Sequence, residues 1–450
     1  MQRVLWGVLC AAALFGCDGS TVVSGAQGGG PDVMDPGDAS LLTAAELAAL
    51  GALSPLPALP PDPTNRYADV PQAAQLGQKL FFDKSYSGAL AVADDGTNGG
   101  LGSVGETGKV SCASCHAPGS QALNDRRSVP GNVSLGTDYG TRVALGIVNS
   151  SFYKWTNWGG RFDSQWSLPL AVAENPKIMN GTRLQLAHML YAKYRAEYNA
   201  TFPVALDPAL DPKATDAARF PASGKPGDAT WNGMTAADQG IVNTVFANYG
   251  KALQAYFRTL ISGPSPFDRF VAGDRAAISA SAVRGIRLFL SKGCAGCHAG
   301  PTFSDDSFHA LGVPQTGPRV PATDLGQYQD VPALLASPFN TQGSYSDDAR
   351  TGKLNGLAQD PGQKGRFRTK SLRNLVGAAP YMHAGQLATL AEVITFYDQG
   401  GGDTGSSGIV KDPRMVPLRL SAQDKQDLVA FLNTLTGDPV PAYLVVDTSK

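Results

Sequence analysis

Two copies of the pattern Cys-x-x-Cys-His constrain this chain more than any other feature of its sequence. The residues of the pattern are Cys112, Cys115 and His116 in the first copy, and Cys294, Cys297 and His298 in the second. In such a pattern the thiols add to the vinyl groups of haem and the adjacent His ligates the iron. A zinc knuckle would need further Cys or His nearby, and a thioredoxin-like pair would need a βαβ context that is missing. We therefore predict two covalently bound haem c groups.

The segments around the two motifs share one layout. Apolar residues recur at helical spacing in a helix before each motif and in a helix that closes each half, so each helix is expected to bury one face. These segments are residues 75–82 and 245–260 in the first half, and residues 283–290 and 422–435 in the second. The repeated layout indicates an internal duplication.

The duplication and the scarcity of period-2 patterns predict a mostly α fold with two cytochrome c-like helical haem domains in tandem. We place the N-terminal haem domain at residues 67–262 and the C-terminal haem domain at residues 263–450. The long loops rich in Gly, Asp and Pro, at residues 87–108, 205–233 and 316–365, are expected to cover the haems or to line a partner site.

The first residues read as an export signal. Residues 1–17 combine a basic start with an apolar run that is too short to span a bilayer as a helix. The run ends in a sequence similar to a bacterial lipoprotein processing box, in which Cys17 becomes the lipidated first residue; ordinary cleavage that discards Cys17 is the alternative. Either way we expect export, and with lipidation a location on the periplasmic side of a bacterial membrane.

Residues 18–66 are rich in Gly, Ala, Pro and Asp, and we expect a flexible tether there. Within it a short helix over residues 43–50 is expected, with Thr43 as its cap and Glu46 at the third position of its first turn.

The charge balance excludes some partners. The chain of 450 residues carries 37 Lys and Arg against 38 Asp and Glu, a net charge of -1. This leaves no electrostatic reason to expect a nucleic acid or a polybasic contact with a membrane, so a lipid anchor is the only membrane attachment we predict.

Four further motifs lie around the haem sites. They are LGQKLFFD at residues 76–83, WGGR at 158–161, FRTKSLRN at 367–374 and APYMHAG at 379–385. Over about residues 73–437 the chain resembles the bacterial di-haem cytochrome c peroxidases and the related MauG branch. The resemblance implies that peroxide reacts at the N-terminal haem, that the C-terminal haem relays electrons, and that Trp158 lies between the haems.

The same resemblance points to a sixth ligand of the C-terminal haem. In the peroxidases a Met follows the His of the Pro-Tyr-x-His motif by fourteen residues; here that position is Tyr397, as in MauG-like members. A phenolate stabilises high-valent iron. Tyr397 is thus the candidate ligand, His383 and Met382 are alternatives by residue type, and packing of Tyr397 on a helix face is the structural alternative.

The N-terminal haem is expected to be five-coordinate. The family's switchable His lies sixteen residues after the proximal one, and here that residue is Asn132. An open iron position is what peroxide binding needs. Of the remaining histidines, we expect His188 to be a partly buried structural residue, and we leave His309 open between a loop residue and a hydrogen-bond partner near the second haem.

The resemblance fails at the residues that move protons. Cleavage of peroxide needs a base, which the family supplies as a Glu twenty residues after the bridging Trp, helped by a Gln ten residues after it. Here these positions are Ile178 and Leu168, so Glu174 becomes the candidate base, against the alternative of an exposed Glu before a turn.

The calcium ion that the family holds between its haems is also in question. The Asn that supplies a side-chain ligand in the family is replaced by Val143. The backbone carbonyl groups near Ala378 and Pro380 remain as potential ligands. We therefore leave one calcium ion open.

Two functions follow from these observations. The first is an exported di-haem peroxidase-type oxidoreductase that takes hydrogen peroxide and receives electrons from a small redox protein or from the side chains of a protein substrate. The second is a non-enzymatic di-haem electron carrier with a disabled peroxidase pocket. A Glu174 carboxylate inside the pocket favours the enzyme, whereas a wall of apolar residues favours the carrier. A homodimer is left open.

Overall fold

The computed structural model describes residues 42–96, 100–125, 131–405 and 408–449. The predicted signal at residues 1–17 and the first part of the predicted tether lie outside these ranges. The α-helices are α1 (Ala44–Leu50), α2 (Pro71–Phe82), α3 (Cys112–Cys115), α4 (Ser167–Glu174), α5 (Arg183–Thr201), α6 (Ala229–Asn232), α7 (Ala236–Phe257), α8 (Pro266–Val271), α9 (Ala280–Ser291), α10 (Gln327–Ala336), α11 (Leu390–Asp398) and α12 (Ala422–Asn433). None of the described helices is long and apolar enough to cross a bilayer.

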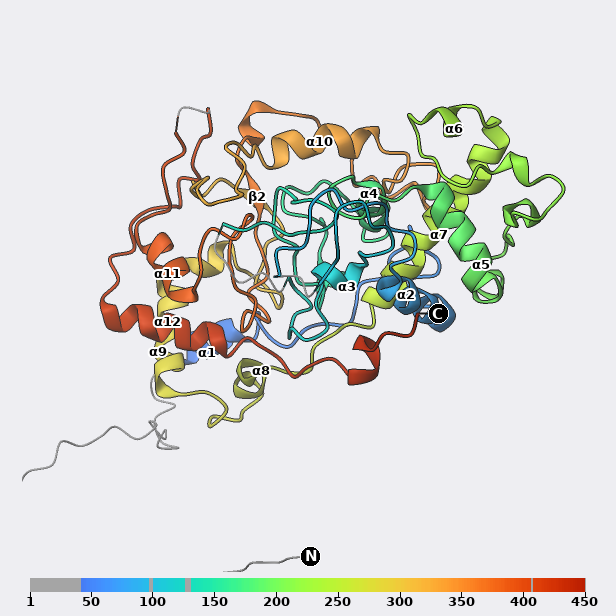
Figure 1. Ribbon diagram of the computed structural model, residues 1–450. Helices are drawn as coiled ribbons and strands as arrows, with labels where there is room; N and C mark the ends of the chain where they lie inside the picture. Colours follow the sequence, from blue (N-terminus) through green and yellow to red (C-terminus); the bar gives the residue numbers. More distant parts are fainter. Residues whose placement is uncertain (1–41, 97–99, 126–130, 406–407, 450) are drawn as a thin grey trace, which may run out of the picture. The chain divides into compact units, whose positions relative to one another are not determined.

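Extended structure is sparse, which confirms the predicted mostly α class. Two short strands, β1 (Phe308–His309) and β2 (Phe367–Arg368), form an antiparallel pair in which Phe308 lies opposite Arg368. The pair brings two segments that are far apart in the sequence side by side. Figure 1 labels β2.

Each half contains a crossing of two helices, and the two crossings match. Helix α2 packs on α7, and α9 packs on α12. A Cβ atom built at Gly77 would lie 2.0 Å from the carbonyl oxygen of Ala252, and one built at Gly285 would lie 2.0 Å from that of Asp427. Only glycine permits such an approach of two helix backbones. Both glycines occupy the same place in the repeated sequence segments, so the structure supports the duplication.

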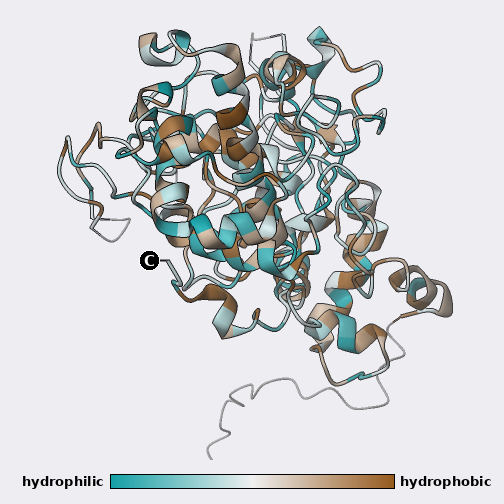
Figure 2. Cartoon of the chain, turned by 90° about the vertical axis from the view of Figure 1, so that its right-hand side faces the viewer, coloured by the Kyte–Doolittle hydropathy of each residue, from teal (hydrophilic) through white to brown (hydrophobic). Residues whose placement is uncertain are grey.

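Two hydrophobic cores lie beneath the helices. One core is built mainly from α2, α5 and α7, and the other from α8, α9 and α12. Figure 1 shows the first group of helices on the right and the second on the left, with α3 between them. The helices in Figure 2 carry both hydrophilic and hydrophobic residues, as expected for amphipathic helices that cover a core.

The predicted tether is corrected over its described part, residues 42–66. The side chains of Leu42, Leu50 and Leu53 are buried in the core formed by α8, α9 and α12, so this part of the chain is packed rather than flexible. Burial of these leucines favours docking by the hydrophobic effect. The short helix itself is confirmed: α1 has Thr43 as its cap, and the side chain of Glu46 completes a capping box.

Residues near the C-terminus pack on the N-terminal half of the protein. Leu444 lies in the core of the N-terminal half, and the Gln78 side chain donates hydrogen bonds to the carbonyl oxygens of Tyr443 (2.8 Å) and Val446 (3.1 Å). The described residues form one compact unit with two cores. The domain boundary between residues 262 and 263 stays a prediction.

Candidate haem sites

The first Cys motif forms a short helix with its histidine directly after it. Cys112 and Cys115 lie at the two ends of α3, and His116 is the residue that ends the helix. The His116 Nδ1 atom lies 3.1 Å from the carbonyl oxygen of Leu123, which fixes the orientation of the ring. Burial lowers the pKa of His116, so the neutral imidazole, the form that ligates a metal, is favoured.

The second motif repeats this arrangement. Cys294 opens a 3₁₀ turn (Cys294–Gly296), and the Nδ1 atom of His298 lies 3.0 Å from the carbonyl oxygen of Phe303. Burial lowers the pKa of His298 as well. A hydrogen bond from one ring nitrogen to a backbone carbonyl is the usual support of a metal-ligating histidine.

None of the four motif cysteines forms a disulfide with another described residue. Burial raises the pKa of Cys112 to about 12 and that of Cys294 to about 11. Redox-active cysteines have the opposite property, a lowered pKa that produces the thiolate. The raised pKa values therefore argue against thiol–disulfide exchange at these cysteines.

Each motif opens into a cavity. The N-terminal cavity, about 300 Å³, is lined by Cys112, Cys115 and His116. The C-terminal cavity, about 340 Å³, is lined by the corresponding residues of the second motif. Both thiols and the imidazole of each motif thus face one space, which is the arrangement that a thioether-linked haem requires.

A buried cation supports the same assignment. Arg368 is 3% exposed and lines both cavities, and its Nη1 atom pairs with Asp306 at 2.6 Å. Within the described part of the chain, the Nε atom of Arg368 has no hydrogen-bond partner. A buried unpaired donor is unfavourable, and a haem propionate is a ligand that would satisfy it. The residues around both cavities therefore fit haem c.

Trp158 forms part of the wall of both cavities. Its indole Nε1 atom donates a 2.8 Å hydrogen bond to the carbonyl oxygen of Val143, which fixes the plane of the ring. The Lys370 ammonium lies 4.5 Å from the centre of the ring. Burial lowers the pKa of Lys370 well below its usual range. The structure therefore puts an aromatic side chain between the two predicted haem sites.

All three candidate sixth ligands of the second haem line the C-terminal cavity: Tyr397, Met382 and His383. Burial, together with the nearby Cys294 and Cys297, raises the pKa of Tyr397. The Nε2 atom of His383 lies within hydrogen-bond distance of the side-chain amide nitrogens of Gln315 (2.9 Å) and Gln386 (3.2 Å). Because both amides face the Nε2 atom of His383, the geometry favours Tyr397 as the ligand, and ligation by Tyr397 stays a prediction.

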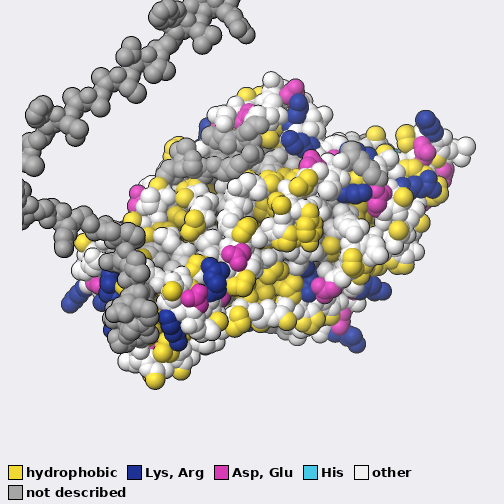
Figure 3. All heavy atoms as spheres, turned by 90° about the horizontal axis from the view of Figure 1, so that it is seen from below, with side chains coloured by type: hydrophobic (Ala, Val, Ile, Leu, Met, Phe, Trp, Pro, Cys, Tyr) yellow, Lys and Arg dark blue, Asp and Glu magenta, His cyan; other side chains and the backbone are white. Residues whose placement is uncertain are grey.

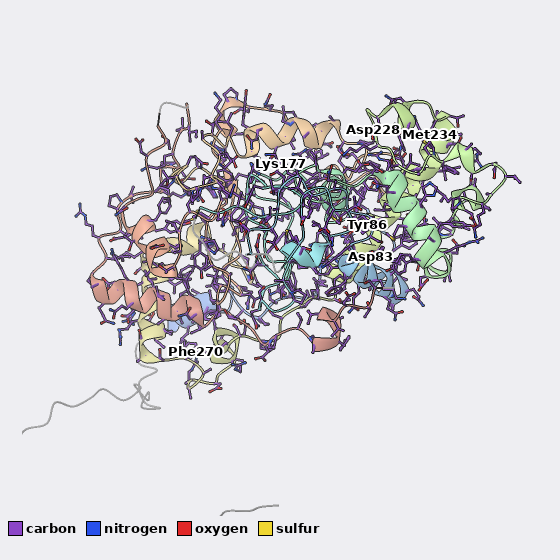
Figure 4. The ribbon with its side chains drawn as sticks, in the orientation of Figure 1. Asp83, Tyr86, Lys177, Asp228, Met234 and Phe270 are labelled. Atoms are coloured by element: carbon purple, nitrogen blue, oxygen red, sulfur yellow. The ribbon has the colours of Figure 1, made fainter. Side chains whose placement is uncertain are left out.

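The proposed base Glu174 lies apart from the N-terminal cavity. Leu168 and Ile178 line that cavity, as their positions in the sequence suggested, but Glu174 is not among its described lining residues. The Glu174 carboxylate instead forms two hydrogen bonds with the Arg183 guanidinium, at 2.8 and 2.7 Å. This geometry does not support Glu174 as the base. Lys177, on the segment after α4, does line the cavity, and Figure 4 labels it.

The remaining histidines and Asn132 take separate places. Both ring nitrogens of His188 face backbone carbonyl oxygens, those of Leu210 on one side and of Phe220 and Pro221 on the other, which fits a structural role. Asn132 is buried and is not among the described lining residues of the N-terminal cavity.

His309 lies near the second haem site and is held there by two carboxylates. Its ring nitrogens lie 3.0 Å from Asp305 and 2.8 Å from Asp412, and it lines the C-terminal cavity. The structure therefore favours the alternative of a hydrogen-bonded residue near the haem over that of a simple loop residue.

The residues considered for calcium, Val143, Ala378 and Pro380, all line the C-terminal cavity. The carbonyl oxygen of Val143 accepts the Trp158 indole hydrogen bond, and Ala378 and Pro380 line the C-terminal cavity. In the described part of the chain, the one group of three metal-ligating side chains is Cys297, Asp305 and His309, which includes a haem cysteine and none of the predicted calcium residues. Calcium stays a prediction without support from these residues.

Sequence reasoning missed one group of charges beside the N-terminal cavity. Arg142 forms hydrogen bonds with Asp324 through Nε and Nη2, both at 2.7 Å, and with Asp330 through Nη1, also at 2.7 Å. Asp330 is a lining residue of the cavity. Both acids belong to residues 316–365, a segment that we expected to cover a haem or to line a partner site, but nothing in the sequence indicated which of its residues would enter a site.

The mostly α fold, the duplicated crossing of helices and the two motif cavities define a di-haem c-type protein. A family model described as di-haem cytochrome c peroxidase matches residues 71–276. The chain is 33% identical over 416 residues to cytochrome-c peroxidase IdrP1 of Denitromonas iodatirespirans, an alignment that covers 88% of this chain and 91% of the relative. It is 30% identical over 444 residues to methylamine utilization protein MauG of Methylorubrum extorquens, with 97% of each chain covered.

The chain belongs to the di-haem cytochrome c peroxidase family, which includes MauG, and it is a di-haem oxidoreductase. The family implies two haem c cofactors. A solved structure of a MauG-like protein associated with microbial copper homeostasis has the same fold, with a TM-score of 0.60 and 24% identity over 87% of this chain and 98% of that one.

Proposed function

We propose that this protein reduces hydrogen peroxide in the N-terminal cavity and that Trp158 passes electrons between the two haem sites. Haem bound at His116 would supply the iron at which peroxide reacts, and haem at His298 would relay electrons from a donor. The observation that carries the proposal is the position of Trp158 in the wall of both cavities.

The two cavities support different roles. Among the described residues that line the N-terminal cavity, His116 is the one histidine, so we expect no second histidine ligand there. In the C-terminal cavity, Tyr397 is available as a second protein ligand. A haem with one protein ligand suits peroxide reduction, and a haem with two protein ligands suits electron relay.

The alternative of a pure electron carrier also has an observation in its favour. Leu168 and Ile178 line the N-terminal cavity, and Glu174 is bound to Arg183 outside it. By the position of Glu174 alone, the carrier is favoured. Against this, relatives that align over most of the chain are named peroxidases, and the N-terminal cavity contains the carboxyl group of Asp330.

The electron source and the location belong to the same proposal. We infer export through residues 1–17, anchoring by a lipid on Cys17, and electrons from a small redox protein or from side chains of a protein substrate; the homodimer stays open. Lys, Arg, Asp and Glu side chains are interspersed on the face in Figure 3, so that face does not favour a partner of one strong charge. Calcium has no step in the proposed function.

Stopped-flow spectroscopy of the fully reduced and the oxidised di-haem protein with hydrogen peroxide tests the proposal. We expect rapid oxidation of the reduced protein, two electrons per peroxide, with spectral changes at both haems. Slow, equal reaction at both haems, or no reaction beyond that of free haem, would instead support the electron carrier.

A further inference from the structure

The N-terminal cavity contains one carboxyl group among its described lining residues, that of Asp330. The residues at the family's proton-moving positions, Leu168 and Ile178, line the same cavity and cannot carry a proton. Glu174 is held outside by Arg183. A peroxidase of this chain would therefore lack a carboxylate base on α4 and on the segment that follows it, where Lys177 is the titratable residue that lines the cavity. A carboxylate that replaces the base has to come from another element.

Asp330 comes from the first turn of α10, in the C-terminal half of the sequence. It is 4% exposed, and its Oδ2 atom lies 2.7 Å from Arg142 Nη1. A Cβ atom built at Gly159 would lie 2.0 Å from Asp330 Oδ2, so the carboxyl group reaches the backbone directly after Trp158. Only a glycine leaves that space free. The position of Asp330 is therefore fixed from two sides.

The charges around Asp330 differ from those around its neighbour Asp324. Burial raises the pKa of Asp330, and the negative charge of Asp324 raises it further. Arg142 and Arg161 lower the pKa, but burial outweighs these cations, so the pKa of Asp330 is raised overall. Asp324 accepts two hydrogen bonds from Arg142 and one from the backbone of Gly326, and its pKa is lowered. Of two acids on one guanidinium, only Asp330 combines a raised pKa with a place in the cavity wall.

We propose that Asp330 is the proton-transferring residue for peroxide cleavage in the N-terminal cavity, an inference that rests on the proposed function. The Asp330 carboxylate accepts a proton from one peroxide oxygen and returns it to the other, which leaves as water when the O–O bond breaks. Two electrons from the haem pair reduce the peroxide, and two protons from solvent convert the remaining oxygen to a second water.

The test compares Asp330→Asn with Asp324→Asn in the purified di-haem protein. Asp324 binds the same guanidinium but is not a described lining residue of the cavity, so its variant controls for disturbance of Arg142. General acid–base catalysis contributes roughly 10²–10⁴-fold. We expect Asp330→Asn to slow the peroxide-driven spectral change by about that factor, and Asp324→Asn to leave it close to the wild-type rate.

Cyanide binding gives a readout that does not depend on turnover. Hydrogen cyanide must lose a proton to bind ferric iron as the anion, so loss of a base in the cavity should slow its association in Asp330→Asn and not in Asp324→Asn. The reduction potentials of both haems, measured by spectroelectrochemical titration, should stay unchanged. Shifted potentials with wild-type peroxide and cyanide rates would overturn the proposal, because they would mean that Asp330 contacts the haem rather than the ligand.

A second variant tests the proposal if Asp330→Asn does not fold. Asp330→Ser is smaller and avoids the close approach to Gly159, and added formate should restore its cyanide rate if a carboxylate is what the cavity lacks. Wild-type cyanide rates in Asp330→Ser without formate would overturn the proposal. A wild-type protein that does not react with peroxide would overturn the proposed function and with it the role in peroxide cleavage. Slowed cyanide binding in Asp330→Asn would then still identify Asp330 as the base of the cavity.

Discussion

Gly77 of α2 lies directly against the backbone of Ala252 in α7, where a Cβ atom would be 2.0 Å from the carbonyl oxygen. We expect Gly77→Ala to force the two helices apart and to lower the free energy of unfolding by about 1–3 kcal/mol, as overpacking of a core does. Urea unfolding of the di-haem protein measures the change. Gly240→Ala, in the same helix as Ala252 but with open space at its Cβ position, should be neutral or stabilising by up to ~1 kcal/mol.

Replacement of Trp158 tests electron transfer between the two haem sites. Trp158→Phe removes the indole and its hydrogen bond to Val143 while an aromatic ring remains in the wall. We expect both haems to be incorporated, and peroxide to oxidise the N-terminal haem, but transfer of electrons from the C-terminal haem to be slowed. Stopped-flow absorbance at wavelengths specific to each haem measures this, and the control is Trp231→Phe, because Trp231 is not a described lining residue of either cavity. Equal transfer rates in the two variants would contradict the role of Trp158.

Ligation by Tyr397 has a spectroscopic consequence. Tyr397→Phe should convert the C-terminal haem to a high-spin state, because the phenolate is its proposed second protein ligand. Near-infrared absorbance or electron paramagnetic resonance measures the change. Tyr381 lines the same cavity but donates its hydroxyl hydrogen bond to the carbonyl oxygen of Leu375, so Tyr381→Phe should leave the spin state unchanged. An unaltered ligand-field spectrum of Tyr397→Phe would exclude this ligand.

The structure gives Glu174 a role in stability rather than in catalysis. Its carboxylate is paired with the Arg183 guanidinium, which also lies over the ring of Phe246 at 4.8 Å from its centre. Glu174→Gln should lower the free energy of unfolding by about 1–3 kcal/mol, since it leaves a largely buried guanidinium without its charged partner. The peroxide rate constant should stay close to wild type. A loss of peroxide reactivity at unchanged haem content would restore Glu174 as the base.

The sequence was sufficient to predict features that depend on the spacing of neighbouring residues. The spacing within each Cys-x-x-Cys-His motif puts thiols and imidazole on one short turn, so the three residues face one cavity in both halves. The apolar period predicted the closing helices, and α7 and α12 contain most of the predicted residues. Capping by Thr43 and Glu46 was likewise local and was confirmed.

Contacts between distant segments could not be predicted in this way. Asp330 belongs to α10, which contains Pro332 and lies in a loop rich in turn residues, so no helix was expected there. Its partner Arg142 is far away in the sequence, and no pattern links the two. The prediction of a flexible tether was wrong over residues 42–66 for a similar reason. Leu50 and Leu53 are isolated apolar residues in a segment rich in polar and small residues, and they become buried only because the C-terminal core offers a surface for them.

The buried His383 predicts how stability depends on pH. Burial lowers the pKa of His383 to about 4, below its usual 6.5. The folded state thus binds fewer protons than the unfolded state between these values, so the contribution of His383 is present above pH 6.5 and is lost as the pH falls through 4. The difference is on the order of 3 kcal/mol. Protonation would also place a proton on Nε2 opposite the Gln315 amide, which lies 2.9 Å away.

Chemical unfolding of the di-haem protein at a series of pH values measures this effect against His383→Gln, which does not titrate. Wild type should lose more stability than the variant between about pH 6.5 and pH 4, and the two curves should run parallel above pH 7. Parallel curves over the whole range would show that His383 is as accessible to protons in the folded state as in the unfolded chain. They would also contradict the packing of its ring on Phe367, where the ring centres lie 4.0 Å apart.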